Sequence, residues 1–325
     1  WGLDGLWDKK WWKKINSLIW TPIDSLPLLD KHESAAKNSK HLIVQASFAK
    51  SELERKGFNN VHLLPVPIDH SNFFKITDEK KLNLRSQKNI DKDDFIIGFV
   101  FRNQLRKSVP NLLEGFKVFA ESNPEIKCKL LLHTHWNEGW DIPRLLKEKN
   151  IDPSLVLTTY YCDQCNQYEI KPFVGQDIDC PICGSQKSQQ TAQIHRGVSE
   201  SQLNEIYNLM DVYCHPFTSG GQEIPIQEAK LCELITLVTN YSCGSDYCTE
   251  QSGGLPLSWT EYREPGTQFI KASTDSKDIA NQLSIVYNMS EPEKVKQGKT
   301  ARDFVIDFCS IDSVCSKFEL LISKM

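Results

Sequence analysis

Ser219-Gly-Gly-Gln-Glu-Ile-Pro-Ile-Gln-Glu-Ala-Lys230 follows an apolar run that ends at Pro216, and together these segments predict a strand, a glycine turn and a helix. The free N–H groups at the start of such a helix attract anions, phosphates above all. Glu228 comes one helical turn later, where its carboxylate can accept hydrogen bonds from vicinal hydroxyls such as those of a ribose. This pattern indicates a nucleotide-sugar site; the alternative is an ordinary glycine-rich loop with a solvated glutamate.

Length and composition are those of a globular protein. The chain has 325 residues, enough for two domains with substantial cores. A formal net charge of -4 argues against bulk electrostatic binding of nucleic acid, although a local basic groove is compatible with it. No apolar run approaches the roughly 18 residues of a membrane span, and the N-terminus lacks the pattern of a secretory signal. The sequence therefore predicts a cytoplasmic protein.

The first 20 residues contain five of the eight tryptophans, interleaved with four lysines. Trp1 stands where a methionine would begin a complete chain, so we expect a fragment or a processed product. Aromatic and basic residues together suit base stacking or a membrane surface. We favour an amphipathic helix with a buried face, from which the lysines extend into solvent.

Four of the eleven cysteines form two closely spaced pairs. Cys162-x-x-Cys165 and Cys180-x-x-Cys183 are separated by 14 residues, which matches paired knuckles that donate four thiolates to a tetrahedral Zn²⁺. The segment between them has few large apolar residues, so we expect its fold to depend on the metal. Four thiolates leave no open coordination position, so we interpret the zinc as structural. A redox pair or chance clustering is the alternative, and the other seven cysteines are expected to be reduced core thiols.

Strands and helices are expected to alternate along the chain. Strands are predicted at 41–46, 61–66, 95–101, 129–133, 155–159 and 234–239, and helices at 47–57, 110–123, 142–150, 199–209 and 224–232, with two more helical patterns within 294–325. The charged segment at 77–94 predicts an exposed linker between domains. Such alternation implies right-handed βαβ units and an open parallel sheet. Ligands bind at the carboxyl ends of its strands, where Arg102, His133 and Pro216 fall.

Arg102-Asn-Gln-Leu-Arg-Lys107 follows the predicted strand that ends at Phe101. Two cations five residues apart can address one diphosphate, the arginine bidentately and the lysine as a point charge. In a transferase that releases a nucleoside diphosphate, such cations stabilise the charge that grows on the leaving group. Taken alone, the motif is more typical of a solvated basic loop.

Three groups of residues then occur in one fixed order: Gly98, Arg102 and Lys107; Gly197-Val-Ser199 with Leu203 and Tyr207; and Pro216 with Ser219, Pro225, Glu228 and Ala229. In this order and spacing the chain resembles the family 4 retaining glycosyltransferases of the GT-B fold. The resemblance covers nearly all of residues 15–325 apart from the cysteine-rich insert. It implies an α/β protein with two Rossmann-like domains, of which the second mainly holds the nucleotide sugar and the first mainly holds the acceptor.

The resemblance also sets the expected domain limits. Residues 1–90 are expected to be an incomplete first domain with its linker, because the family has a long further segment before the strand that resembles Ser17–Thr21. The nucleotide-sugar domain is expected at 91–300, with the zinc-ribbon insert at 160–188. Residues 301–325 are expected to form a C-terminal helix that packs back on the first domain.

Individual roles follow from the same resemblance. Arg102 and Lys107 match the diphosphate-binding pair, and Glu228 matches the second glutamate of an E-x7-E motif, which binds ribose. Gly220 takes the place of the first glutamate. The expected donor-binding residues are Gly220, Gly221, Gln222, Glu223, Ile224, Glu228 and His133, with Glu223 or Gln222 as the substitute contact to the sugar hydroxyls; the expected metal ligands are Cys162, Cys165, Cys180 and Cys183.

Asp24 completes the expected catalytic set with Arg102 and Lys107. It lies in Thr21-Pro-Ile-Asp24-Ser25, at the place of a catalytic-face residue of the family. Its carboxylate would steady positive charge at the anomeric carbon or orient the acceptor hydroxyl; the alternative is a turn aspartate that caps the next segment. His133 and His135 are either donor contacts, a metal-binding pair or loop histidines with ordinary partners.

The leading interpretation is a glycosyltransferase that moves a sugar from a nucleotide-diphosphate-sugar donor to an unidentified acceptor, with retention of configuration and without a catalytic divalent metal. The acceptor class, whether glycan, lipid, protein or nucleic acid, stays open. The alternative is a catalytically inactive GT-B-like protein that uses the zinc ribbon to dock on a partner or on nucleic acid. Four acidic residues in the insert outnumber its two lysines, which weighs against nucleic acid.

Overall fold

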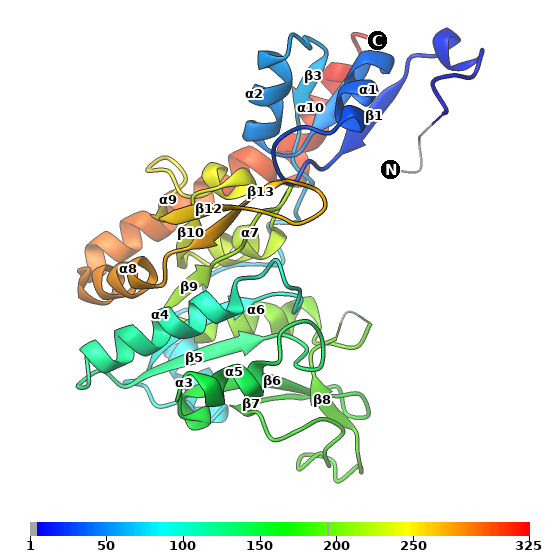
Figure 1. The fold of residues 1–325 in the computed structure, drawn as a ribbon. Helices are drawn as coiled ribbons and strands as arrows, with labels where there is room; N and C mark the ends of the chain where they lie inside the picture. The colour runs from blue at the N-terminus through cyan, green and yellow to red at the C-terminus, as the bar shows by residue number, and fades with distance from the viewer. Residues whose placement is uncertain (1–4, 194) are drawn as a thin grey trace.

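The computed structural model describes residues 5–193 and 195–325, and it contains two parallel sheets surrounded by helices (Figure 1). The first sheet has three parallel strands, in the order β1 (Leu18–Thr21), β2 (His41–Val44) and β3 (Val61–Leu63). Helices α1 (Asp30–Asn38) and α2 (Ser47–Arg55) connect these strands. Leu42, Val44 and Leu53 are completely buried in the core between the sheet and its helices.

The second sheet has eight strands, in the order β11-β10-β9-β4-β5-β6-β7, with β8 paired to β6. Their bounds are β4 Phe95–Val100, β5 Cys128–His133, β6 Val156–Cys162, β7 Tyr168–Pro172, β8 Gln189–Thr191, β9 Val212–His215, β10 Ile235–Thr239 and β11 Gly254–Leu257. Six strands are parallel, whereas β7 and β8 run antiparallel to β6. The parallel strands follow the Rossmann order, in which the chain reverses its direction of winding between β4 and β9.

Helices cover both faces of this sheet, so its central strand β4 is buried along its whole length. The helices around it are α3 Asp78–Gln87, α4 Val109–Ser122, α5 Ile142–Glu148, α6 Glu200–Leu209, α7 Ile224–Leu231, α8 Ser276–Asn288 and α9 Glu291–Cys309. Helix α4 packs closely on α8, because a Cβ on Gly115 would lie 2.6 Å from the Cβ of Ile279. The parallel α/β architecture predicted from the sequence is confirmed.

Two elements tie the sheets together. After α9 the chain returns to the first sheet, where α10 (Ile311–Ile322) lies beside β1 (Figure 1). Trp20 and Phe318 stack with ring centroids 5.9 Å apart, and the amide of Ile68 donates to the carbonyl of Cys309 at 2.9 Å. An antiparallel hairpin of β12 (Trp259–Arg263) and β13 (Ile270–Thr274), which the sequence did not predict, lies between the sheets.

The charged segment at 77–94 connects the two sheets and is mostly exposed, as expected of a linker, but Asp78–Gln87 form helix α3, which packs through Leu84 and Arg85. Arg85 is only 4% exposed, and its guanidinium donates to the carbonyls of Leu209 and Asp94. The same guanidinium pairs with the Asp211 carboxylate at 2.6 Å. The ion pair of the buried Arg85 therefore holds in place a segment whose charges had predicted exposure to solvent.

The amphipathic helix expected near the N-terminus is wrong for residues 5–20. This part has only one short 3-10 turn, η1 (Trp12–Lys14), before β1 begins. Trp12 is buried and donates from Nε1 to the carbonyl of Asn38 at 2.6 Å, whereas Trp11 is half exposed. The buried indole of Trp12 anchors this segment. A longer helix is excluded because residues 18–21 pair with β2 as strand β1. Trp1 lies outside the described residues.

None of the helices in the described part of the chain combines the length and the apolar character that crossing a bilayer requires.

We expect Arg85→Leu to lower the free energy of unfolding by about 3 kcal/mol, because it leaves two buried carbonyls and part of the Asp211 charge without a donor. Arg144→Leu is the matched control, since Arg144 makes an exposed pair with Glu148 and should change stability by about 0.5 kcal/mol or less. Urea unfolding followed by circular dichroism measures both. Equal midpoints for the two variants would contradict a structural role for α3.

Candidate functional site

The candidate site lies where β4 and β9 diverge at their carboxyl ends. The loops that follow these strands run together, because the amide of Thr218 donates to the carbonyl of Arg106 at 2.8 Å and the amide of Ser108 donates to the carbonyl of Pro216 at 3.3 Å. A β-bridge also joins Lys107 to Phe217. In sheets with this strand order, ligands bind in the crevice at the reversal point.

Four side chains meet there: Arg106, Lys107, His215 and Glu223, referred to below as the Glu223 cluster. The Glu223 carboxylate is 3% exposed and forms ion pairs with both Arg106 and Lys107. Nε2 of His215 lies 3.2 Å from the same carboxylate and 3.2 Å from Nζ of Lys107. Loop residues from two parallel strands thus surround one buried negative charge.

The charges of the Glu223 cluster follow from its contacts. Burial alone would raise the pKa of Glu223, but the charges of Lys107 and Arg106 hold that pKa well below its usual value. Burial, and then the Lys107 charge, lower the pKa of His215 to about 4, so the imidazole is neutral near pH 7. Two cations and one carboxylate leave the Glu223 cluster with a net charge of +1.

Hydrogen bonds assign the tautomer of His215. The Tyr213 hydroxyl donates to the carbonyl of Val100 at 3.0 Å, so its oxygen accepts from Nδ1 of His215 at 2.9 Å. The unprotonated Nε2 then accepts from Lys107. His215 therefore positions the lysine ammonium without adding charge.

Arg102 does not share this position with Lys107, although the spacing of the motif placed the two together. Its Nε lies 3.2 Å from the Glu138 carboxylate, and its side chain is 52% exposed. Among the described residues, no hydrogen bond or ion pair joins Arg102 to the glycine turn (residues 219–223). Arg106, which the sequence analysis did not single out, contacts Glu223 instead. The sequence feature that could have identified Arg106 is its position directly before Lys107.

Two glycines allow close approach on either side of the turn. A Cβ on Gly220 would lie 2.7 Å from Oε1 of Glu223, so this carboxylate fills the space in which a side chain at position 220 would begin. A Cβ on Gly221 would lie 2.6 Å from Cβ of Pro22 and 2.7 Å from Oδ1 of Asp24. The exposed Asp24 therefore faces the glycine turn from the first sheet.

Gln222 fastens the glycine turn to the first sheet. Its Oε1 accepts from the amide of Val66 at 2.6 Å, and its Nε2 donates to the carbonyl of Val66 at 3.0 Å. Both ends of the Gln222 amide are occupied, and the Glu223 carboxylate is occupied by its ion pairs with Arg106 and Lys107. Ile224 begins α7 and is 41% exposed.

Glu228 lies within α7, next to Tyr207 of α6. The Tyr207 hydroxyl donates to the Glu228 carboxylate at 2.6 Å. Burial raises the pKa of Glu228 to about 7, although the hydrogen bond from Tyr207 opposes this effect. The group is therefore poised between its neutral and charged forms near neutral pH.

His133 lies at the end of β5 beside a cavity of about 210 Å³, referred to below as the His133 cavity. Its lining includes Arg102, His133, Thr134, His135, Gln193 and Pro225. Nδ1 of His133 is 3.0 Å from the Thr159 hydroxyl, and burial lowers the pKa of His133 to about 4. The Thr134 hydroxyl is buried without a hydrogen-bond partner among the described residues. The cavity thus offers neutral polar groups and one arginine, which is paired with Glu138 of the same lining.

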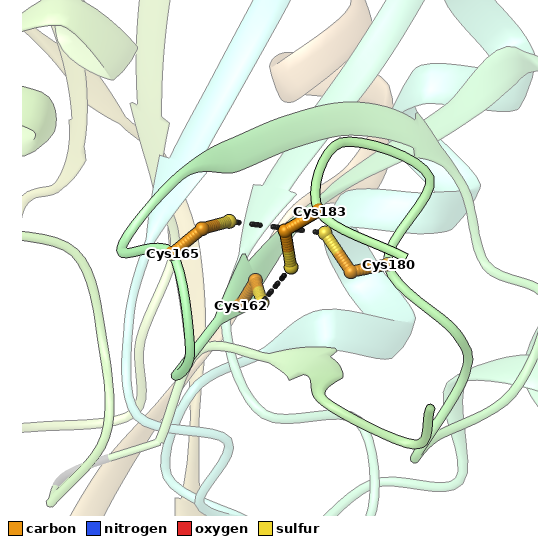
Figure 2. Close-up of side chains that lie close together, drawn as sticks. All are labelled: Cys162, Cys165, Cys180 and Cys183. Atoms are coloured by element: carbon orange, nitrogen blue, oxygen red, sulfur yellow. Dashed lines mark hydrogen bonds between the residues drawn. The ribbon is translucent and has the colours of Figure 1, made fainter. Parts of the chain in front are cut away.

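The four clustered cysteines converge at the tips of two loops (Figure 2). All four Sγ atoms lie within 4.8 Å of one another, with Cys162 and Cys183 separated by 3.8 Å and Cys165 and Cys180 by 3.9 Å. A tetrahedron of thiolates about 2.3 Å from Zn²⁺ has sulfur atoms about 3.8 Å apart, so the geometry is compatible with zinc. All eleven cysteines are free, and six of the remaining seven are buried.

The segment that carries these cysteines has more apolar packing than the sequence indicated. Strand β7 buries Tyr168 and Ile170 in the core of the large sheet, and Phe173 stacks on Trp136 with centroids 4.4 Å apart. The few apolar residues of this segment are therefore well packed, and the dependence of its fold on a metal stays a prediction. Pairing of β7 and β8 with β6 extends the sheet into the segment.

The raised pKa of Glu228 predicts a pH-dependent stability. Its proton is held more tightly in the folded state, so the stabilisation is complete below the usual pKa of 4.5 and is lost as the pH rises through about 7. We expect Glu228→Gln to be more stable than the natural protein at pH 8.5 by roughly 1–3 kcal/mol and equally stable at pH 4.5. Thermal unfolding at both pH values measures this; the exposed Glu250→Gln is the control. A pH-independent difference would contradict it.

Solved glycosyltransferases have the same arrangement of two domains. A sucrose-phosphate synthase from Thermosynechococcus elongatus aligns with a TM-score of 0.63 and 16% identity, over 90% of this chain and 60% of its own. HepE from Anabaena, solved with UDP and glucose, aligns with a TM-score of 0.63 and 12% identity, over 91% of this chain and 66% of its own. A glycosyltransferase from Rickettsia africae aligns with a TM-score of 0.64 and 11% identity, over 94% of this chain and 70% of its own.

No protein-family model matches the sequence, and no curated protein matches it either. The chain spans less than two thirds of the length of the first two solved structures. Identities of 11–16% establish the architecture and leave the activity to be argued from the site. The chain has the GT-B fold, with Rossmann-like sheets of mixed α/β topology.

Proposed function

We propose that the protein is a glycosyltransferase that moves a sugar from a nucleotide-diphosphate-sugar donor to an acceptor, with retention of configuration as in family 4. The observation that supports this best is the Glu223 cluster, in which Arg106 and Lys107 meet a carboxylate beside the start of α7. Cations and free helix N–H groups at one place suit a diphosphate. Anabaena HepE, which has the same fold, was solved with UDP-glucose.

The donor would lie along the crevice from the glycine turn to the His133 cavity. Its diphosphate would contact Lys107 and Arg106, and the charge that develops on the leaving group would be stabilised there. The ribose hydroxyls would donate to Glu228, which accepts most strongly as a carboxylate, above about pH 7. Arg102 and His133 would contact the nucleoside from the cavity.

Glu223 would contact the sugar hydroxyls in place of the glutamate that Gly220 replaces. Its carboxylate fills the space where a side chain at position 220 would begin, so one carboxylate would serve where the family uses another position. Gly220, Gly221 and Ile224 would shape the donor surface, and Gln222 would hold it against Val66. Asp24, exposed across from Gly221, would orient the acceptor hydroxyl or steady charge at the anomeric carbon.

The proposed division of labour keeps residues 91–300 for the donor and 1–90 for the acceptor, with the ribbon at 160–188 and the C-terminal helix at 301–325 against the first sheet. Cys162, Cys165, Cys180 and Cys183 would hold one structural zinc, which supplies cross-linking and no chemistry because its coordination is complete. The acceptor class and the cytoplasmic location stay predictions.

A second candidate is a nucleotide-binding protein without transferase activity. It is favoured by one observation: Glu223 already neutralises one of the two cations that the diphosphate would need. Such a protein would bind the donor weakly and leave it intact, with the ribbon available for docking.

Donor binding tests the proposal. We expect one nucleoside diphosphate among UDP, GDP and ADP to raise the melting temperature, and its Kd to rise at least about tenfold in Glu228→Ala. The double variant Lys107→Met, Glu223→Gln removes the cation without leaving a buried carboxylate unpaired, and it should lose binding similarly. Lys147→Met, on the exposed face of α5, is the control. Binding that none of these variants changes would refute the site.

Turnover separates the two candidates. Incubation with UDP-, GDP- and ADP-sugars should release nucleoside diphosphate by transfer or slow donor hydrolysis, and NMR of the product reports its anomeric configuration. Release with an inverted product would refute retention. Binding without release would favour the second candidate.

Metal analysis tests the cysteine site. We expect one zinc per chain, and Cys180→Ser and Cys183→Ser should each abolish it, because a three-thiolate site holds zinc far less tightly. Cys315→Ser, which changes an exposed cysteine outside the cluster, should keep the metal. Titration of all eleven thiols without a chelator or denaturant would contradict the site.

A further inference from the structure

We infer that the cysteine ribbon (residues 162–193) forms one wall of the donor site, and that its metal therefore governs nucleotide affinity and the choice of base. This inference rests on the proposed function and extends it to residues that the family resemblance did not include. The observation that supports it is a continuous path of contacts from the cysteines to the His133 cavity.

Strand β8 makes the first step of that path. It pairs with the end of β6, where Cys162 is opposite Gln189 and Tyr160 is opposite Thr191. Because β7 occupies the other edge of β6 at the same residues, β8 lies on the edge shared with β5, just beyond the carboxyl end of β5. A strand that starts beside the cysteines thus ends beside the cavity.

Thr191 makes the second step. Its completely buried hydroxyl accepts from the amide of Trp136 at 3.2 Å and from Nε2 of Gln176 at 2.5 Å. Nδ1 of His135 lies 3.2 Å from the same oxygen. The ribbon therefore fixes the loop that follows β5, and the next two ribbon residues, Ala192 and Gln193, line the cavity.

The loop after β5 makes the third step, because it positions Arg102. Asn103 accepts from the amide of Trp140 at 3.0 Å and donates to its carbonyl at 2.9 Å. Glu138 in the same loop pairs with Arg102 at 3.2 Å. Displacing the ribbon would free this loop and with it the only cation that lines the His133 cavity among the described residues.

The chemistry of the cavity suits a nucleobase edge. Within residues 5–193 and 195–325 the buried Thr134 hydroxyl has no hydrogen-bond partner, and the Gln193 amide, held by Gln190 at 2.6 Å, offers both a donor and an acceptor. Neutral hydrogen-bonding groups distinguish bases, whereas the charge at Lys107 binds any diphosphate. Gln193 would therefore influence which base is bound, and Lys107 would not.

Metal and nucleotide binding should then be linked reciprocally. If the metal orders the ribbon and the ribbon completes the cavity, removing the metal weakens nucleotide binding by the same factor by which nucleotide protects the metal. The Kd for UDP, GDP and ADP is measured by calorimetry on the zinc-loaded and the chelator-treated full chain. The rate of zinc transfer to a chromogenic chelator is measured with and without each nucleotide.

We expect Thr191→Val to weaken the bound nucleoside diphosphate by about 5–10-fold and to speed zinc release, while Thr191→Ser, which keeps the hydroxyl, behaves as the natural protein. Gln193→Ala should change the ratio of affinities among the three nucleotides. Ile182→Ser alters an exposed side chain between two of the cysteines and should change neither quantity. Melting temperatures confirm that each variant is folded.

The outcomes are distinguishable. If Glu228→Ala abolishes binding while Thr191→Val, Gln193→Ala and the metal-free protein bind all three nucleotides as before, the inference is overturned and the proposed function stands. If no nucleotide binds the zinc-loaded natural protein, both are overturned. Nucleotide-dependent protection of the metal, lost in Thr191→Val, supports the coupling without any measurement of turnover.

Discussion

The burial of one carboxylate at the reversal point of the large sheet constrains the rest of this structure. A buried charge is costly unless ion pairs and hydrogen bonds compensate it, so Glu223 requires Lys107 and Arg106 to turn inward. That requirement draws together the loops after β4 and β9 and fixes where α7 begins. Every other element of the candidate site is placed relative to these loops: the glycine turn, the first turn of α7, and the loop of the first sheet that carries Asp24.

The two sheets meet through several polar contacts at this point, beside apolar residues of the first sheet such as Ile43 and Ala46 that belong to the core of the large sheet. Gln222 bonds to the backbone of Val66, Nζ of Lys271 donates to the Ser25 hydroxyl at 3.0 Å and to the Ser219 hydroxyl at 2.7 Å, and Asp246 accepts from the amide of Ser47 at 2.9 Å. Polar interfaces between domains permit relative motion more readily than apolar ones. A donor in the crevice would therefore be enclosed by groups that can exchange partners, which is the behaviour a transfer reaction between two substrates requires.

Apolar patterning predicted the elements that lie inside the sheet, and charge patterning failed where charges are buried. The runs at 95–101 and 129–133 became β4 and β5 because apolar residues on both faces leave no other buried conformation. Helix α3 was missed because Lys81 and Arg85 pair with Asp211, which lies just before β9 and far away in the sequence, and no local pattern reveals such a pairing. In the site, the order of motifs indicated Lys107, Glu228 and the glycine turn. It could not show that Arg106 rather than Arg102 contacts Glu223, because that choice depends on how the loop after β4 folds.

The position of the cysteine site follows from the sheet itself. An edge strand with unpaired N–H and C=O groups must be covered, and here β7 and β8 cover the two edges of the projecting end of β6. Strand β6 runs parallel to β5 and extends beyond the carboxyl end of β5. A returning strand that pairs with this extension, on the edge that β6 shares with β5, must therefore lie at the carboxyl end of β5. Ligands of such sheets bind at that end. The cysteine ribbon inserted after this strand is therefore brought to the proposed nucleotide side of the molecule by strand polarity alone, whatever holds its tip together.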